Sequence, residues 1–259
     1  MKVVLSRKGF DSGYGRIPSP ILPDGTLLSL PIPTSVPGRR FADLSRAGFS
    51  YEQVITDLGG DQVMAAGFCH LDPDLRPGDV EGWVPVFGQV GAAQTHLANQ
   101  GVGVGDLFLF FGRYRQTELV DAHLRYVRQA PVLHVVFGYL QVGQIIQGEA
   151  VRDYWWHPHA GYVQRPNNTL YVASEHLFDS LMPGVGTFAY RDDRVLTAPG
   201  HALSQWRLLD WMVGTPISYH SAASRRDGYF QSAAKGQEFV VDANPGVLGW
   251  AKTLLTTGT

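Results

Sequence analysis

The segment Asp106-Leu107-Phe108-Leu109-Phe110-Phe111 decides the fold class, because five apolar residues follow one another after a single aspartate. A run of this length suits a strand that is buried on both faces, and it is too short to cross a membrane as a helix. Glycines precede it in Gly101-Val102-Gly103-Val104-Gly105, and Gly112 follows it. Such glycines favour turns. We therefore expect a fully buried strand at the centre of the fold.

Further strands are predicted on both sides of this segment. Residues 132–146 are rich in β-branched side chains, and Gly138 and Gly143 within them mark expected bulges or bends. Shorter apolar runs predict strands at residues 3–6, 168–172 and 239–241.

Short helices are expected between these strands, at residues 51–58, 91–99, 174–181, 204–212 and 247–255. Strands dominate and the helices alternate with them irregularly, which favours an α+β fold over a doubly wound parallel sheet. We predict a strand-rich mixed sheet or a partly open barrel with several short helices. No domain boundary stands out, so residues 1–259 are expected to form a single compact domain.

The overall composition excludes several classes of protein. The 259 residues include 21 Lys and Arg against 23 Asp and Glu, a net charge of −2, which excludes a generally basic protein that coats nucleic acid but leaves room for a local basic groove. The single cysteine, Cys69, excludes an intramolecular disulfide framework and is expected to be a small buried residue. No apolar run is long enough for a membrane span or a signal peptide, so we expect a cytoplasmic protein.

The segment Ser6-Arg7-Lys8-Gly9-Phe10-Asp11-Ser12-Gly13-Tyr14-Gly15 follows the first predicted strand and is a candidate nucleotide-binding loop. Its glycines let backbone N–H groups approach a ligand closely, and Arg7 and Lys8 can hold a phosphate or pyrophosphate. Asp11 can orient a hydroxyl or act as a base, with Ser12 beside it. The alternative is a surface turn in which Asp11 and Ser12 bond to the local backbone. The spacing matches neither a P-loop nor a Rossmann glycine motif.

Gln89 and His96 stand next to or within the predicted helix at residues 91–99. A glutamine amide offers a paired donor and acceptor that can read a base edge or a ribose. His96 can act as an acid or a base near neutral pH. The alternative is that His96 lies on the solvated face of a helix that packs through Leu97.

Gln237 and Glu238 stand at the entrance of the predicted strand at residues 239–241, where a carboxylate is costly unless it is paired or used. This segment resembles ADP-ribosyltransferases that act on DNA, in which a late glutamate enters a strand after small residues. The resemblance implies that Glu238 holds a ribose and polarises the bond that breaks, that Arg7 grips a pyrophosphate, and that NAD is a candidate donor. The alternative is a structural Glu238 paired with Lys235.

Arg113, Tyr114 and Arg115 follow the central strand and offer cations and an aromatic ring of the kind that binds nucleic acids. The turn into the central strand, with a second strand at residues 134–143, resembles PUA-like barrels, which include readers of modified or flipped bases. This resemblance implies a barrel segment at about residues 101–173.

No metal site is assigned from the sequence. His157 and His159 form a pair without a third ligand at a known spacing. Asp72 and Asp74 flank Pro73, an arrangement that is more typical of turns than of cation sites.

Three blocks of sequence together resemble one family. They are residues 6–12 with residues 18–21, Phe87-Gly88-Gln89 with residues 105–112, and Gly236-Gln237-Glu238-Phe239. They are similar to the nucleotide-modification-associated domain family, the third of the classes so named. The resemblance implies a link to modified nucleotides or nucleic acids, without an established reaction.

The sequence therefore supports three hypotheses. The first is an enzyme of nucleotide or nucleic-acid modification that transfers ADP-ribose or another group from a nucleotide donor to a base. The second is a non-enzymatic PUA-like reader of modified nucleic acid, and the third is a scaffold that binds a small molecule. For the enzyme, the candidate catalytic residues are Asp11, His96 and Glu238, and the candidate nucleotide-binding residues are Arg7, Lys8, Ser12, Gln89, Arg113 and Gln237.

Overall fold

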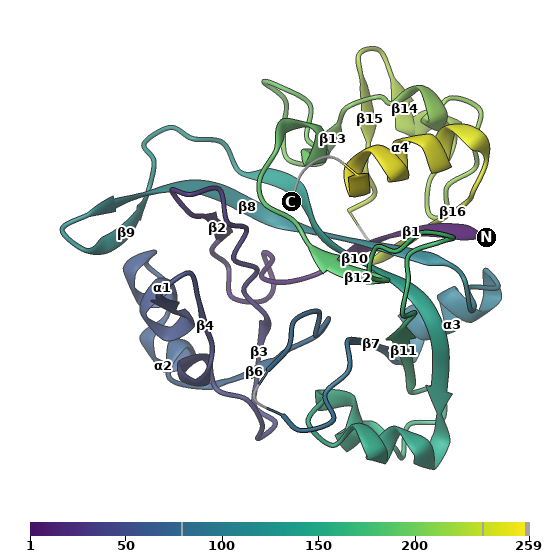
Figure 1. Cartoon of the computed structure of the whole chain (residues 1–259). Helices are drawn as coiled ribbons and strands as arrows, with labels where there is room; N and C mark the ends of the chain where they lie inside the picture. The colour runs from purple at the N-terminus through teal and green to yellow at the C-terminus, as the bar shows by residue number, and fades with distance from the viewer. Residues whose placement is uncertain (79, 235, 257–259) are drawn as a thin grey trace.

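The computed structural model describes residues 1–78, 80–234 and 236–256 of the chain. Within these residues a nine-stranded mixed sheet crosses the middle of the molecule (Figure 1). Six strands form its main path, in the order β16 (Glu238–Asp242), β1 (Lys2–Arg7), β8 (Leu107–Val120), β10 (Leu133–Gln147), β11 (Thr169–Ala173) and β7 (Val86–Gln89). Three shorter strands attach to this path: β2 (Ser19–Ile21) and β9 (His123–Tyr126) on β8, and β12 (Val185–Thr187) on β10.

The predicted central strand is confirmed as β8, which lies between β1 and β10. Strand β1 runs parallel to β8, with Leu5 opposite Leu109, whereas β16 pairs antiparallel with β1 and β10 pairs antiparallel with β8. In the described part of the chain the end strands β16 and β7 do not pair with each other, so the sheet is not closed into a barrel. The prediction of an α+β fold built on a strand-rich mixed sheet is confirmed.

Alternation along the strands divides their side chains between two cores, because successive residues point to opposite faces of a sheet. Leu5 of β1 and Phe239 of β16 lie in the core beneath α4 (Pro245–Thr256). Val4 of β1 and Val240 of β16 lie in the opposite core, which also contains Phe87 of β7. Burial of each such side chain stabilises the fold by roughly 1.5–3 kcal/mol. The same alternation continues beyond the strand ends, so neighbouring polar residues of the site lie on opposite faces of the sheet.

The long strand β10 bends at both glycines that the sequence singles out. Its pairing register shifts between Val136 and Gly138 and again between Val142 and Gln144. A Cβ atom on Gly138 would lie 2.9 Å from the carbonyl oxygen of Gly186 in β12. A side chain there would block the close approach of β12, so glycine is required at this bend.

Smaller elements surround the sheet. The other strands are β3 (Ile32–Thr34), β4 (Ser45–Arg46), β5 (Phe49–Ser50), β6 (Phe68–His70), β13 (Gln205–Trp206), β14 (Arg225–Arg226) and β15 (Tyr229–Gln231). The other α-helices are α1 (Tyr51–Asp57), α2 (Gln62–Ala65) and α3 (Gly91–Asn99). Short 3-10 helices are η1 (Phe41–Asp43), η2 (Gly148–Tyr154), η3 (Pro158–Tyr162), η4 (Asp192–Arg194), η5 (Asp210–Met212) and η6 (Ala222–Ser224).

Two predicted helices are wrong. Residues 174–181 form bends and turns, because Leu177 N–H donates to the carbonyl of Met182 and closes a loop. Residues 204–212 contain strand β13 and the short helix η5. There Trp206 packs against Phe111 and donates its indole N–H to Nδ1 of His134, 2.9 Å away. These tertiary contacts hold an extended backbone that the local sequence does not specify.

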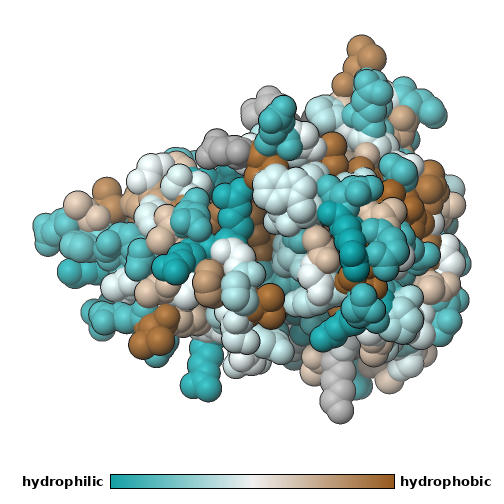
Figure 2. Space-filling view, turned by 90° about the horizontal axis from the view of Figure 1, so that it is seen from below, coloured by the Kyte–Doolittle hydropathy of each residue, from teal (hydrophilic) through white to brown (hydrophobic). Residues whose placement is uncertain are grey.

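The face turned away from α4 is mostly hydrophilic, with hydrophobic residues scattered over it in small groups (Figure 2). None of the helices in the described ranges combines the length and the apolar character needed to cross a membrane.

Candidate functional site

A cavity of about 500 Å³ lies where β1 ends and β16 begins. Five residues that the sequence singles out line it: Arg7, Lys8, Asp11, Gln89 and Gln237. They come from both ends of the chain and from β7. The glycine-rich loop after β1 and the residues just before β16 therefore border the same cavity. This arrangement follows from the pairing of β1 with β16.

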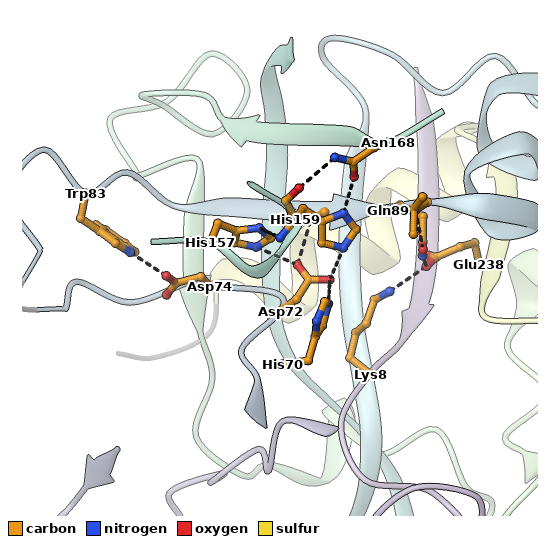
Figure 3. Close-up of polar contacts among 12 residues, drawn as sticks. Lys8, His70, Asp72, Asp74, Trp83, Gln89, His157, His159, Asn168 and Glu238 are labelled. Atoms are coloured by element: carbon orange, nitrogen blue, oxygen red, sulfur yellow. Dashed lines mark hydrogen bonds and ion pairs between the residues drawn. The ribbon is translucent and has the colours of Figure 1, made fainter. Parts of the chain in front are cut away.

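Glu238 lies next to this cavity as part of a buried ion pair (Figure 3). Its Oε1 accepts hydrogen bonds from Nζ of Lys8 at 2.9 Å and from Nε2 of Gln89 at 2.7 Å. Ser6 pairs with Glu238 across the two strands, so Lys8, two residues further on, emerges on the same face. Oε2 of Glu238 is buried and makes no hydrogen bond with the described residues. Lys235, the alternative partner predicted for Glu238, lies outside the described residues.

Arg7 points to the other face of the sheet, as its position between Ser6 and Lys8 requires. Its guanidinium lies 5.7 Å from the ring centre of Phe239 and donates to the carbonyls of Ala233 and Gly236, each at 3.0 Å. Burial lowers the pKa of Arg7, although the charges of Asp11 and Glu238 oppose this shift. Arg7 therefore lines the cavity while it holds the backbone that leads into β16.

Asp11 and Ser12 adopt the turn that the sequence left as an alternative. Oδ1 of Asp11 accepts from the backbone N–H groups of Gly13 and Tyr14, both at 2.7 Å. Asp11 nevertheless borders the cavity. Ser12 is exposed and is not among the residues that line the cavity.

His96 stands on α3 outside the cavity lining. Its Nε2 lies 3.0 Å from Oγ of Ser218, which in turn lies 3.4 Å from the carbonyl oxygen of Glu238. The His96 ring also packs on Tyr219, with 4.3 Å between the ring centres. Burial lowers the pKa of His96, and the charge of Glu238 opposes that shift. His96 is thus connected to the backbone of Glu238, and not to its carboxylate.

The basic and aromatic surface expected around Arg113 is not formed. Tyr114 is fully buried in the core beside β7, so its ring cannot stack on a base. Burial raises the pKa of the Tyr114 phenol. Arg113 is partly buried opposite His134 and does not line this cavity. The central strand is apolar on both faces, and its alternation carries Tyr114 inward with Phe108 and Phe110.

A second group of residues lines the same cavity: His70, Asp72, His159, Tyr162 and Arg165. From the sequence, Asp72 and His159 are weighed as metal ligands and not assigned, and the other three are not predicted as site residues. Their sequence signals are two short patterns, His70-Leu71-Asp72 and His157-Pro158-His159, which the fold brings together. Each pattern alone is weak, because neither contains three ligands. Only the tertiary structure shows that they belong to one cluster.

Asp72 is the centre of that cluster and is buried, contrary to its interpretation as a turn residue (Figure 3). Its Oδ1 accepts from the backbone N–H of Gly88 at 2.8 Å and lies 3.2 Å from Nε2 of His157. Burial raises the pKa of Asp72, but the hydrogen bond from His157 and the charges of His157, His159 and Lys8 outweigh it, so the pKa lies below its ordinary value. The carboxylate is therefore ionised.

Burial disfavours protonation of the two imidazoles, those of His70 and His159, that face Oδ2 of Asp72. Burial lowers the pKa of His159 to about 4, against the opposing charge of Asp72. Burial also lowers the pKa of His70, and Asp72 again opposes the shift. Asp74, the other aspartate beside Pro73, instead accepts from the indole N–H of Trp83 at 2.9 Å.

A second cavity of about 490 Å³ borders the first at Gly9 and Asp72. Arg39, Arg46 and Arg76 line it. Burial and the neighbouring charge of Arg76 lower the pKa of Arg46. Asp72 thus lies in the wall between two cavities that both carry cationic side chains.

Comparison with known families identifies the family to which the chain belongs. The model of a family described as nucleotide modification associated domain 3 matches residues 2–242. No curated protein and no solved structure matches the chain. The matched region includes both cavities and every candidate site residue from Arg7 to Glu238.

Proposed function

Because the chain belongs to the nucleotide modification associated domain 3 family, we propose that its 500 Å³ cavity binds a nucleotide and that the protein is an enzyme of nucleotide or nucleic-acid modification. The observation that carries this proposal is that Arg7, Lys8 and Gln89 line one cavity, and that Lys8 and Gln89 bond to the carboxylate of Glu238 next to it. Two cations suit phosphate groups, and a buried carboxylate beside them suits a ribose hydroxyl.

The phosphate end of the nucleotide is assigned to the cationic side chains of the cavity. Arg165 is exposed at the rim, and Lys8 and Arg7 lie deeper. Arg165 lies 4.9 Å from the ring centre of Tyr162, so its guanidinium is held by the ring and keeps its donors available.

The base of the nucleotide is assigned to the aromatic residues. Tyr14 and Tyr162 line the cavity, and an aromatic face stacks on any base with little sequence preference. Gln237 is exposed in the lining and offers an amide that can pair with a base edge. A nucleotide therefore finds groups for its base and its phosphates in one cavity.

Glu238 is the residue proposed to act on the ribose. Lys8 and Gln89 bond to Oε1, and we assign the buried Oε2, which has no partner among the described residues, as the acceptor for a ribose hydroxyl that enters from the adjoining cavity. In the most specific form of the proposal, NAD is the donor and the bond between its ribose and nicotinamide breaks with the electron pair leaving on nicotinamide. A base nitrogen then bonds to the ribose carbon and loses its proton. Binding of the hydroxyl by Glu238 supports the positive charge that develops on the sugar.

Mass spectrometry tests this function. The protein is incubated with DNA, RNA or free nucleotides, each with NAD or another nucleotide donor, and the nucleic acid is then digested and analysed. We expect a mass increase on a nucleotide with the wild type, and loss of at least about tenfold of that product with Glu238→Gln at a temperature at which both proteins are folded. Unchanged product with Glu238→Gln, or no modification of any substrate by the folded wild type, would reject the assignment.

A further inference from the structure

We propose that His70, Asp72 and His159 bind one divalent transition-metal ion, with coordination positions left open toward the cavity. The three residues come from two stretches of the chain: His70 ends β6 and Asp72 lies just after it, whereas His159 lies in η3. Their candidate ligand atoms all lie within 4.8 Å of one another. This inference does not depend on the nucleotide function, because it rests on the geometry of three side chains.

The distances in the cluster fit an ion better than direct contact. Oδ2 of Asp72 lies 4.0 Å from Nε2 of His70 and 4.0 Å from Nε2 of His159. Both separations exceed a hydrogen bond. Ligands that each lie about 2.0–2.2 Å from a shared metal ion are themselves on the order of 3–4 Å apart. Small side-chain movements therefore bring all three atoms to bonding distance of one ion.

Asn168 fixes the orientation of the His159 ring, so that Nε2 faces Asp72 (Figure 3). Nδ2 of Asn168 donates to the carbonyl of His159 at 2.9 Å, so its Oδ1 is the atom 2.7 Å from Nδ1 of His159. Nδ1 therefore donates to Asn168, and Nε2 is the ring nitrogen left to bind an ion beside Oδ2 of Asp72.

Asp72 is held by groups that do not occupy its second oxygen. Gly88 and His157 bond to Oδ1, and Oδ2 is the atom that faces His70 and His159. The side chain of His157 is fully buried. In metal centres, the side chains that bind the ion are usually oriented by further hydrogen bonds, as Asp72 is by Gly88 and His157 and as His159 is by Asn168.

The ligand set indicates the class of ion and the kind of site. Two imidazoles and one carboxylate suit Zn²⁺ or Fe²⁺, whereas Mg²⁺ and Ca²⁺ prefer oxygen ligands alone. Three protein ligands leave positions for water or a substrate atom, as in catalytic sites. All three residues line the cavity, so the open positions face the space assigned above to the nucleotide.

Metal binding to the full chain, without nucleotide, tests the proposal. Protein stripped with a chelator is titrated calorimetrically with Zn²⁺, with Fe²⁺ under anaerobic conditions, and with Mg²⁺. We expect one ion per chain for Zn²⁺ or Fe²⁺, with at least about 100-fold weaker binding of Mg²⁺. The relative affinities decide between the two transition metals. If neither Zn²⁺ nor Fe²⁺ binds stoichiometrically, the proposal is overturned.

Variants locate the ion. His159→Gln and Asp72→Asn are expected to lose binding, and His157→Gln to weaken it by about 10–100-fold through its hydrogen bond to Asp72. His201→Gln is the matched control, because His201 is exposed and is not part of the cavity. An equal loss in His201→Gln and His159→Gln would place the ion elsewhere.

If a variant fails to fold, X-ray absorption spectroscopy of the Zn²⁺-loaded wild type still identifies the atoms that bind the ion. The expected shell contains two imidazole nitrogens together with oxygen ligands. A shell of oxygen atoms alone would overturn the proposal. Nucleotide binding can fail without affecting either measurement, so the two proposals are tested separately.

Discussion

Nζ of Lys8 lies 2.9 Å from Oε1 of Glu238, across 230 positions of sequence. Both side chains are buried, with 9% of Lys8 and 1% of Glu238 exposed. The contact joins the loop after β1 to the start of β16. It therefore brings residues near the two ends of the chain together beside one cavity.

Removing either charge of this pair is expected to destabilise the fold strongly. Lys8→Met and Glu238→Gln each leave a buried charge without its partner, at a cost of about 3–5 kcal/mol in the free energy of unfolding. The free energy of unfolding of the double variant is expected to fall by less than the sum of the two single losses, because no unpaired charge remains. Urea denaturation of the wild type, the two single variants and the double variant measures this coupling. Strictly additive losses of stability would contradict it.

Gly88→Ala is expected to disturb the metal cluster. A Cβ atom on Gly88 would lie 2.4 Å from Cδ2 of His159, so the ring, which is bonded to Asn168, would have to shift. We expect a stability loss of about 1–3 kcal/mol and weaker Zn²⁺ binding. Gly161→Ala is the matched control, because nothing lies within 4 Å of its Cβ position. Retention of wild-type Zn²⁺ affinity in Gly88→Ala would speak against the placement of His159.

Stability is expected to fall between pH 6.5 and about 3 in part because of His134. Burial, together with the charges of Arg7 and Arg113, lowers the pKa of His134 to about 3. Below its ordinary pKa of about 6.5 the unfolded chain binds a proton that the folded chain does not, so stability decreases as the pH falls through this range.

His134→Gln removes the titrating ring and retains an acceptor for the indole of Trp206. Its melting temperature should therefore fall less steeply between pH 6.5 and 4 than that of the wild type. Parallel curves for the two proteins would show that His134 does not contribute.

Cys69 is expected to be unreactive in the folded protein. Burial raises the pKa of its thiol to about 12, and its side chain lies within the core around α1. A disulfide reagent such as dithiobis(nitrobenzoic acid) should leave the native thiol unmodified at pH 8 and label it fully in guanidinium chloride. Rapid labelling without denaturant would contradict its burial.

The sequence predicts those features that depend on local patterns. Strand β8 follows from its own apolar run, and helix α3 has the bounds that its flanking glycines indicate. Arg7, Lys8 and Gln89 line one cavity, and the sequence predicts them as candidates because cations, amides and glycines beside strands are recognisable in isolation.

Features that depend on distant partners were missed. The segment Asp72-Pro73-Asp74 has the local pattern of a turn, and Asp72 acquires its role from His157, 85 positions away. Tyr114 is predicted at the end of the central strand as part of a stacking surface with Arg113 and Arg115, but β8 continues past it and its side chain is buried. Trp206 likewise replaces an expected helix by a strand through its bond to His134.

Nucleotide binding is the central claim, and calorimetric titration with NAD and ADP tests it most directly. The titrations compare the wild type with Arg165→Ala at the cavity rim and with Arg125→Ala, an exposed arginine on β9 that does not line the cavity. We predict saturable binding that weakens with salt, is unchanged in Arg125→Ala, and is reduced by about tenfold in Arg165→Ala, as loss of one charged hydrogen-bonding group implies. Equal affinities of all three proteins, or no binding of either nucleotide to the wild type, would contradict the account.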